Sequence, residues 1–90
     1  MSASATTKPL LDAYVACVAD RAKSFAGSAD SAESIVKDAM EACAVHRRAL
    51  SDALQTARIN LEELTDFLKK YDGQVSEAAS QAVLDERNAH

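Results

Sequence analysis

The chain has 90 residues, enough for one domain with a modest core, and its many alanines with only two Gly and one Pro are typical of an all-α protein. The net charge is −4, and the one basic cluster, His46–Arg48, has no aromatic neighbour, so we expect no nucleic-acid partner. No apolar run approaches the roughly 18 residues that a membrane span requires, and we expect no membrane span.

The N-terminal segment, residues 1–7, is small and polar, and we expect it to be disordered ahead of a single helical domain over residues 8–90. This segment lacks the apolar stretch of a signal peptide. Two interpretations of the location follow. The protein is cytoplasmic, or it is periplasmic or secreted and the signal peptide has been removed.

A first helix is predicted over residues 8–26. Thr7 can cap its N-terminus, and Pro9 would lie in the first turn, where the missing N–H group is tolerated. Apolar residues then recur from Leu10 to Phe25 at the spacing of one helical face. Gly27 would end this helix in a left-handed conformation.

A second, very long helix is predicted over residues 31–71. Asp30 and Glu33 can form its N-terminal cap, and no helix-breaking residue follows before Gly73. The apolar seam contains one extra step of four residues near Thr56–Asn60. Such a step locally unwinds a supercoil, so a break at Thr56–Asn60 is the alternative to a continuous helix. A third, short helix is expected over residues 74–88.

These lengths predict a helical hairpin and a third helix packed around one long central helix, which carries a coiled-coil-like seam. The outer helices are too short to cover that central helix, so part of its apolar stripe would stay open. Dimerisation into a bundle would close it. The candidate interface residues lie in the second half of the long helix, although they could equally be core under the third helix: Leu54, Leu61, Leu64, Phe67, Leu68 and Tyr71.

The two cysteines, Cys17 and Cys43, lie almost level in a hairpin that turns between Gly27 and Asp30. Facing interior positions of two packed helices can hold a disulfide, which would stabilise the fold by roughly 3.5 kcal/mol. Two buried free thiols are one alternative. A metal site is the other, with ligands drawn from Cys17, Met40, Cys43 and His46.

No residue pattern points to catalysis. The cysteines are distant in sequence and mid-helix, whereas a dithiol enzyme uses a Cys-x-x-Cys pair at a helix N-terminus. Two glycines cannot supply a phosphate-binding loop, and no strand is expected that could present a nucleophile. We therefore expect that the protein is not an enzyme and uses no cofactor.

The pattern Tyr14-Val-Ala-Cys17, followed by Ala39 and Cys43 in the next helix, resembles the small helical-hairpin proteins that many proteobacteria export. The resemblance covers residues 10–50. It implies an oxidised Cys17–Cys43 pair and a periplasmic or secreted location. Most members of that group have no assigned activity, so the resemblance implies no catalytic residue.

The sequence thus predicts a non-enzymatic helical protein that acts by protein–protein interaction or self-association, with a second copy or another helical protein as partner. A metal-binding helical bundle with Cys and His ligands is one alternative hypothesis. A cytosolic inhibitor or adaptor protein, for example phage-encoded, with free thiols and an acidic contact surface, is the other.

Overall fold

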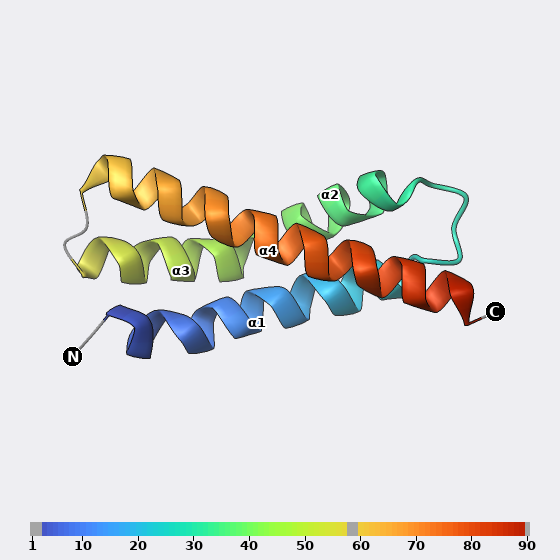
Figure 1. Cartoon of the computed structure of the whole chain (residues 1–90), viewed down its shortest axis with the longest axis horizontal. Helices are drawn as coiled ribbons and strands as arrows, with labels where there is room; N and C mark the ends of the chain where they lie inside the picture. Colours follow the sequence, from blue (N-terminus) through green and yellow to red (C-terminus); the bar gives the residue numbers. More distant parts are fainter. Residues whose placement is uncertain (1–2, 58–59, 90) are drawn as a thin grey trace.

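The computed structural model describes residues 3–57 and 60–89, with side chains from Thr7 onward. These residues form four helices, α1 (Ala3–Ser24), α2 (Ala32–Ala42), α3 (Ala44–Thr56) and α4 (Leu61–Asn88), and no strand occurs among them (Figure 1). The predicted all-α class is confirmed.

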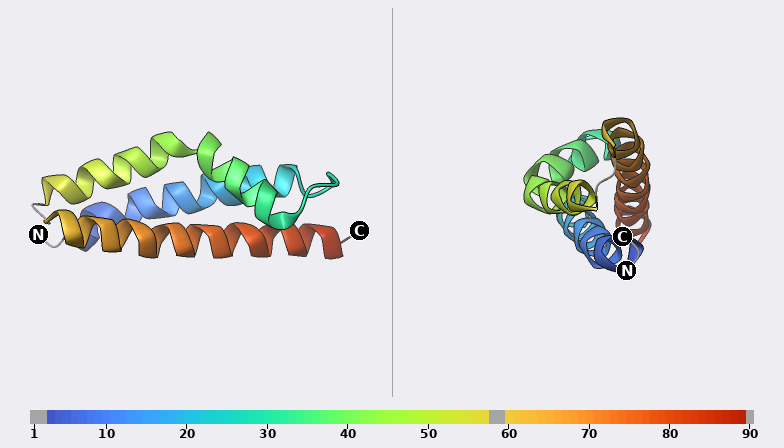
Figure 2. Two further views of the ribbon diagram at one scale, coloured as in Figure 1. Left: turned by 90° about the horizontal axis from the view of Figure 1, so that it is seen from above. Right: turned by 90° about the vertical axis from the view of Figure 1, so that its left-hand side faces the viewer.

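The chain runs forward along α1, back along α2 and α3, and forward again along α4 (Figure 1). The result is an elongated bundle of 45 × 20 × 17 Å. We call α2 and α3 together, residues 32–56, the arm. Figure 2 shows that the arm approaches α4 at its two ends and bows away from α4 near the α2–α3 junction. The backbones of the arm and α4 are therefore farther apart near this junction than at the two ends of the arm.

The first helix differs from the prediction at both ends. It begins at Ala3, inside the segment that we expected to be disordered, so Thr7 is a buried helical residue and not an N-cap. Pro9 also lies inside α1. Beyond Ser24 the chain continues in tight turns, in which the amides of Phe25, Ala26 and Ser28 each donate to the carbonyl three residues earlier. Gly27 does not adopt a left-handed conformation, and the expected glycine stop is wrong.

The second helix begins one residue after the predicted start, and its cap is different. Ser31, and not Asp30, is the N-cap, since its hydroxyl accepts a hydrogen bond of 3.2 Å from the Ser34 amide. A serine hydroxyl in this position satisfies one of the amides that the first turn of a helix leaves without a partner.

The predicted continuous helix over residues 31–71 is wrong, because the chain breaks twice within it. The alternative break at Thr56–Asn60 is confirmed: α3 ends at Thr56 and α4 begins at Leu61. Asn60 caps α4, since its side-chain oxygen accepts from the Glu63 amide at 2.8 Å while its amide group donates to the Glu63 carboxylate at 3.0 Å. The first bond satisfies an amide that the first turn of α4 leaves without a partner, and the second joins the two side chains at the helix start. The other break is at Cys43, between α2 and α3.

The predicted helix end at Gly73 is also wrong, because α4 continues through this residue to Asn88. A glycine inside a helix costs roughly 0.5–1 kcal/mol relative to alanine. Here Val75, Ala79 and Val83 are fully buried on the far side of Gly73, and this apolar burial outweighs the cost.

One core connects all four helices. Tyr14, Val18 and Ala22 of α1 are fully buried along its centre, and the arm and α4 pack on either side of them. The remaining buried apolar residues are Ala26, Ile35, Val36, Ala39, Cys43, Leu50, Leu54, Leu64, Val75, Ala79 and Val83. No helix in the described part of the chain is both long and apolar enough to cross a membrane.

Candidate functional site: a groove between the arm and α4

A disulfide joins Cys17 of α1 to Cys43, with the two Cα atoms 6.1 Å apart. Cys43 is only 1% exposed and is both the C-cap of α2 and the N-cap of α3. The predicted pairing is confirmed. Its position at the bend means that the cross-link holds the arm against α1 at the point where the arm lies far from α4 (Figure 2).

The four residues considered as metal ligands do not form a ligand set here. The sulfurs of Cys17 and Cys43 are bonded to each other, so neither is a thiolate in this oxidised form. Met40 and His46 are half-buried. Among the described residues, no group of three or more His, Cys, Asp or Glu side chains lies together in an arrangement that could hold a metal ion.

The six predicted interface residues divide into three groups. Leu54 and Leu64 are buried in the core, and Phe67, Leu68 and Tyr71 are half-buried against it, with the Phe67 and Tyr71 rings stacked 6.0 Å apart. Leu61 alone is largely exposed, at 78%. Within one chain, therefore, the five residues other than Leu61 are buried or half-buried, as in the alternative in which they are core.

A buried hydroxyl and an ion pair link three helices at the middle of the bundle. The Tyr14 hydroxyl donates to Oδ1 of Asp72 at 3.0 Å. Arg47 donates to the same carboxylate through Nε, at 3.0 and 3.1 Å, and through Nη2, at 2.9 Å. Such a fork between guanidinium and carboxylate is the strongest common ion-pair geometry. The Arg47–Asp72 pair thus links α3 to α4 beside the Tyr14 hydroxyl.

These neighbours set the protonation states of the cluster. Burial, followed by the negative charge of Asp72, raises the pKa of Tyr14 to about 12. The hydrogen bonds to Asp72 raise the pKa of Arg47 above its already high value. At neutral pH Tyr14 is therefore a neutral donor and Arg47 is charged, so neither can act as a base or a nucleophile.

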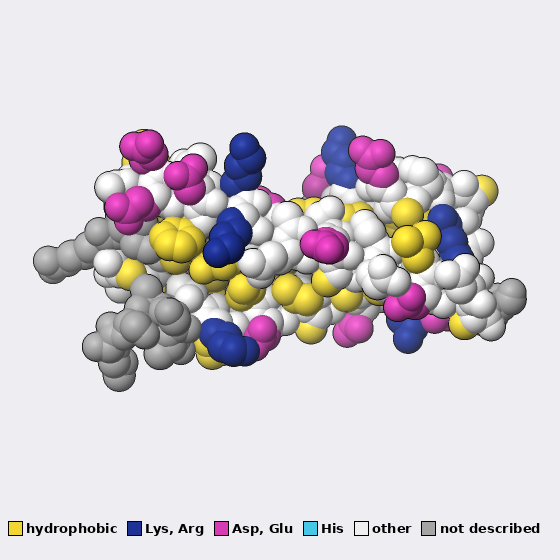
Figure 3. Space-filling model, viewed as in Figure 1, with side chains coloured by type: hydrophobic (Ala, Val, Ile, Leu, Met, Phe, Trp, Pro, Cys, Tyr) yellow, Lys and Arg dark blue, Asp and Glu magenta, His cyan; other side chains and the backbone are white. Residues whose placement is uncertain are grey.

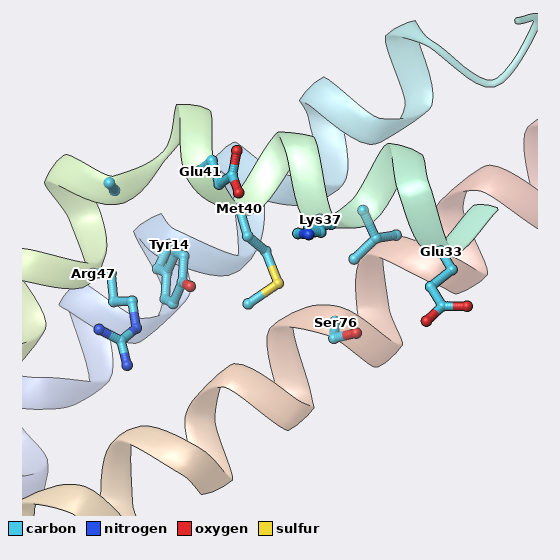
Figure 4. Close-up of a pocket in the computed structure, with 9 residues that line it drawn as sticks. Tyr14, Glu33, Lys37, Met40, Glu41, Arg47 and Ser76 are labelled. Atoms are coloured by element: carbon cyan, nitrogen blue, oxygen red, sulfur yellow. The ribbon is translucent and has the colours of Figure 1, made fainter. Parts of the chain in front are cut away.

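A groove with a volume of about 530 Å³ lies beside this cluster, between the arm and α4. Its volume falls in the range of natural ligand-binding sites. Met40 points from α2 into the space between the two walls, with Ser76 of α4 on the opposite side (Figure 4). Tyr14 and Arg47 close one end, and Glu33 lies toward the other (Figure 4). The lining residues are Tyr14, Glu33, Val36, Lys37, Met40, Glu41, Ala44, Arg47 and Ser76.

The groove has an apolar base and charged edges. Figure 3 shows a hollow in the upper outline of the molecule, with hydrophobic side chains at its base and acidic and basic side chains on the walls around it. Glu33, Lys37 and Glu41 follow one another at intervals of four along the exposed edge of α2. On α4 the lining residue is Ser76, whose side chain is small.

The groove was not predicted from the sequence, although the spacing of the residues that line its arm side is visible in the chain. Glu33, Lys37, Met40, Ala44 and Arg47 follow alternating steps of four and three residues, the period of a helical seam. A search for apolar repeats passes over them because three of the five are charged. We call these five residues the arm stripe.

Comparisons of the chain with protein-family models, with curated proteins and with solved structures find no match.

Proposed function

We propose that the protein is a non-catalytic recognition protein that binds an amphipathic helix in the groove between the arm and α4. The observation that carries the proposal is the groove itself: a preformed, elongated hollow with an apolar base and charged edges. Helix recognition requires apolar contacts at helical spacing and polar groups that set the register, and the groove offers both.

The dimensions of the groove favour a helix as its occupant. The arm stripe runs from Glu33 to Arg47, which corresponds to a length of roughly 20 Å along a helix. A partner helix of about four turns can lie along it. Ser76 on the opposite wall leaves room for close approach of a second backbone. The groove thus has the length and openness for a helix, with walls on both sides.

The chemistry of the groove supports binding and not catalysis. Its one buried hydroxyl, on Tyr14, is committed to Asp72 and stays protonated because its pKa is raised to about 12. The Arg47 guanidinium is held by the same carboxylate. Glu33, Lys37 and Glu41 are exposed on the rim. These charges can select a partner and steer its register.

The disulfide supports an action outside the cytoplasm, in the periplasm or after secretion. Disulfides persist in oxidising compartments and are rare where thiols are kept reduced. In this structure both cysteines are paired, whereas the metal-binding and cytosolic alternatives require free thiols. An oxidising compartment would maintain the disulfide, and the disulfide holds the arm against α1.

The experiment is a selection of binders from a display library of designed amphipathic helices about 18 residues long. Binders enriched on the oxidised protein should lose at least tenfold in affinity for a Met40→Glu variant, because a carboxylate then enters the apolar base of the groove. Leu61→Glu is the matched control, since it makes the same kind of change at an exposed apolar residue outside the groove. Binders with equal affinity for the parent and for Met40→Glu would contradict the proposal.

A further inference from the structure

The two ends of the arm stripe carry opposite charges at equal numbers of residues from its centre. Glu33 and Arg47 each lie seven residues from Met40, since 40 − 33 and 47 − 40 are both seven. Val36 and Ala44, both in the groove, lie four residues from Met40 on either side. When two copies of this surface are related by a two-fold rotation at Met40, the acidic end of each stripe faces the basic end of the other.

We infer that the occupant of the groove is a second copy of this chain, packed with its arm antiparallel to the first about a two-fold axis at Met40. The inference rests on the proposed function and names its partner. In a two-fold interface the same patch is used by both copies. Glu33 of each copy then faces Arg47 of the other, and Met40 meets Met40.

The charged groups needed for this pairing are available. Glu33 is exposed and makes no ion pair within the described residues. Arg47 uses Nε and Nη2 toward Asp72, which leaves its Nη1 group without a hydrogen bond among the described residues. The Arg47 side chain is 43% exposed. A carboxylate from a second copy can therefore reach the free edge of the guanidinium.

Electrostatics favours this face and this direction. Two chains of net charge −4 repel each other, but the groove lining carries Lys37 and Arg47 against Glu33 and Glu41, two charges of each sign. Repulsion is least where such a balanced face meets its copy. A parallel arrangement would place Glu33 against Glu33 and Arg47 against Arg47. Like charges in contact disfavour that arrangement, so the antiparallel one is selected.

The fold makes room for the second arm. The arm bows away from α4 near the α2–α3 junction (Figure 2), and the groove of about 530 Å³ lies between them, lined on the arm by Met40, Glu41 and Ala44. An arm seated there would lie across Ser76 of the other copy, and by symmetry each arm would contact both walls of the opposite groove. The arm and α4 of the two copies would then form a four-helix bundle.

The first test is sedimentation velocity of the oxidised protein over a concentration series up to about 1 mM, the range in which weak homodimers form. The parent chain should form a dimer. Glu33→Arg should weaken the association at least tenfold, because two arginines then face each other in each half of the interface. Asp20→Arg is the matched control, since it makes the same charge change at an exposed position of α1 outside the groove. Its dimer should be as strong as that of the parent or stronger.

The second test fixes the position of the axis independently of the charge change. A residue on a two-fold axis meets its own copy, so Met40→Cys should yield a disulfide-linked dimer under mild oxidation. Glu33→Cys should not, because its copy lies roughly 20 Å away along the arm. Circular dichroism of each variant confirms that the helices are intact.

A parent chain that stays monomeric at the highest concentration, or cross-linking through Glu33→Cys but not Met40→Cys, would overturn the inference. Neither result touches the proposed function, which depends on whether helices selected from the library bind at Met40. Conversely, a dimer that is insensitive to Glu33→Arg and shows no Met40→Cys cross-link uses another face, and it also overturns the inference.

Discussion

Arg47 and Asp72 lie 25 residues apart in the chain and are joined by three hydrogen bonds of 2.9 to 3.1 Å between α3 and α4. The pair separates two hollows: Arg47 lines the groove on one side and, with Asp72, a second hollow toward Leu68 on the other. Because the same carboxylate accepts the Tyr14 hydroxyl, the pair also fixes the side chain at the centre of the core.

Asp72→Ala should destabilise the fold by about 2 kcal/mol, because the fully buried Tyr14 hydroxyl loses its acceptor. Asp72→Asn should cost less, since its amide oxygen can still accept from Tyr14 and the partly exposed ion pair contributes at most about 1 kcal/mol. Urea unfolding of both variants measures the change. Asp66→Ala, at an exposed position of the same helix, is the control. Equal stability of Asp72→Ala and Asp66→Ala would refute the role of Asp72.

Tyr14 should ionise at about pH 12, two units above the ordinary tyrosine value of 10.0. A Tyr71→Phe variant leaves Tyr14 as the only tyrosine, and its absorbance near 295 nm reports the titration directly. The control is the same variant unfolded in denaturant, in which the midpoint should return to about 10.

The same shift has a consequence for stability. The folded pKa lies above the unfolded value, so between pH 10 and pH 12 the unfolded chain loses its proton first. The stabilising contribution of the neutral Tyr14 is complete below pH 10 and is lost as the pH rises to 12, with a total of about 3 kcal/mol. Tyr14→Phe should remove this dependence. If the parent and Tyr14→Phe lost stability equally between pH 10 and pH 12, the loss would arise from a group other than Tyr14.

Reduction of the Cys17–Cys43 bond should lower the free energy of unfolding by about 3.5 kcal/mol, since the bond closes a loop across 26 residues in the unfolded chain. Urea titrations with and without reductant give the difference. A Cys17→Ala, Cys43→Ala double variant should match the reduced protein and should not respond to reductant. Intact mass after denaturing thiol alkylation provides the check on the bond itself, and label uptake by the untreated protein would show that the bond is absent.

Gly73→Ala should stabilise the protein by roughly 0.5–1 kcal/mol, because alanine has the higher helix propensity and restricts the unfolded chain. A Cβ atom built at Gly73 has no neighbour within 4 Å, so no steric cost opposes this gain. Thermal or urea unfolding detects a change of this size. Destabilisation by the alanine would mean that α4 stops or bends at Gly73, as the sequence had led us to expect.

The all-α class could be predicted from the sequence because it depends on composition and on local helical spacing. The level placement of the two cysteines in a hairpin favoured their pairing over the alternatives, and the break near Thr56–Asn60 was open only as the alternative to a continuous helix. The position of the longest helix could not be predicted. Glycine commonly ends helices, so Gly73 predicts a stop, yet the tertiary burial of Val75, Ala79 and Val83 decides whether the helix continues. The Asn60-x-x-Glu63 spacing at the start of α4 is a pattern typical of a helix N-terminus.

The site was less predictable than the fold. The Tyr14–Asp72 hydrogen bond joins residues 58 positions apart, and no periodicity links them. The groove also depends on the bend at Cys43, which lies in a stretch without Gly or Pro. Glu33, Lys37 and Arg47 are charged, so a hydrophobic pattern does not reveal the helical spacing that they share. The groove lies on the first half of the predicted long helix, whereas the predicted interface residues lie on its second half.

The location of the cross-link bears on the order of events when the chain folds. Both sulfurs belong to the hairpin made by α1 and the arm, and no residue of α4 lies between them in the chain. Oxidation can therefore occur while α4 is still unstructured, and α4 then meets a hairpin in which the arm is already tied to α1. In a reducing environment α4 would meet a hairpin that lacks this tie at Cys43. The compartment in which the chain first folds thus determines whether the arm is bonded to α1 before α4 packs against both.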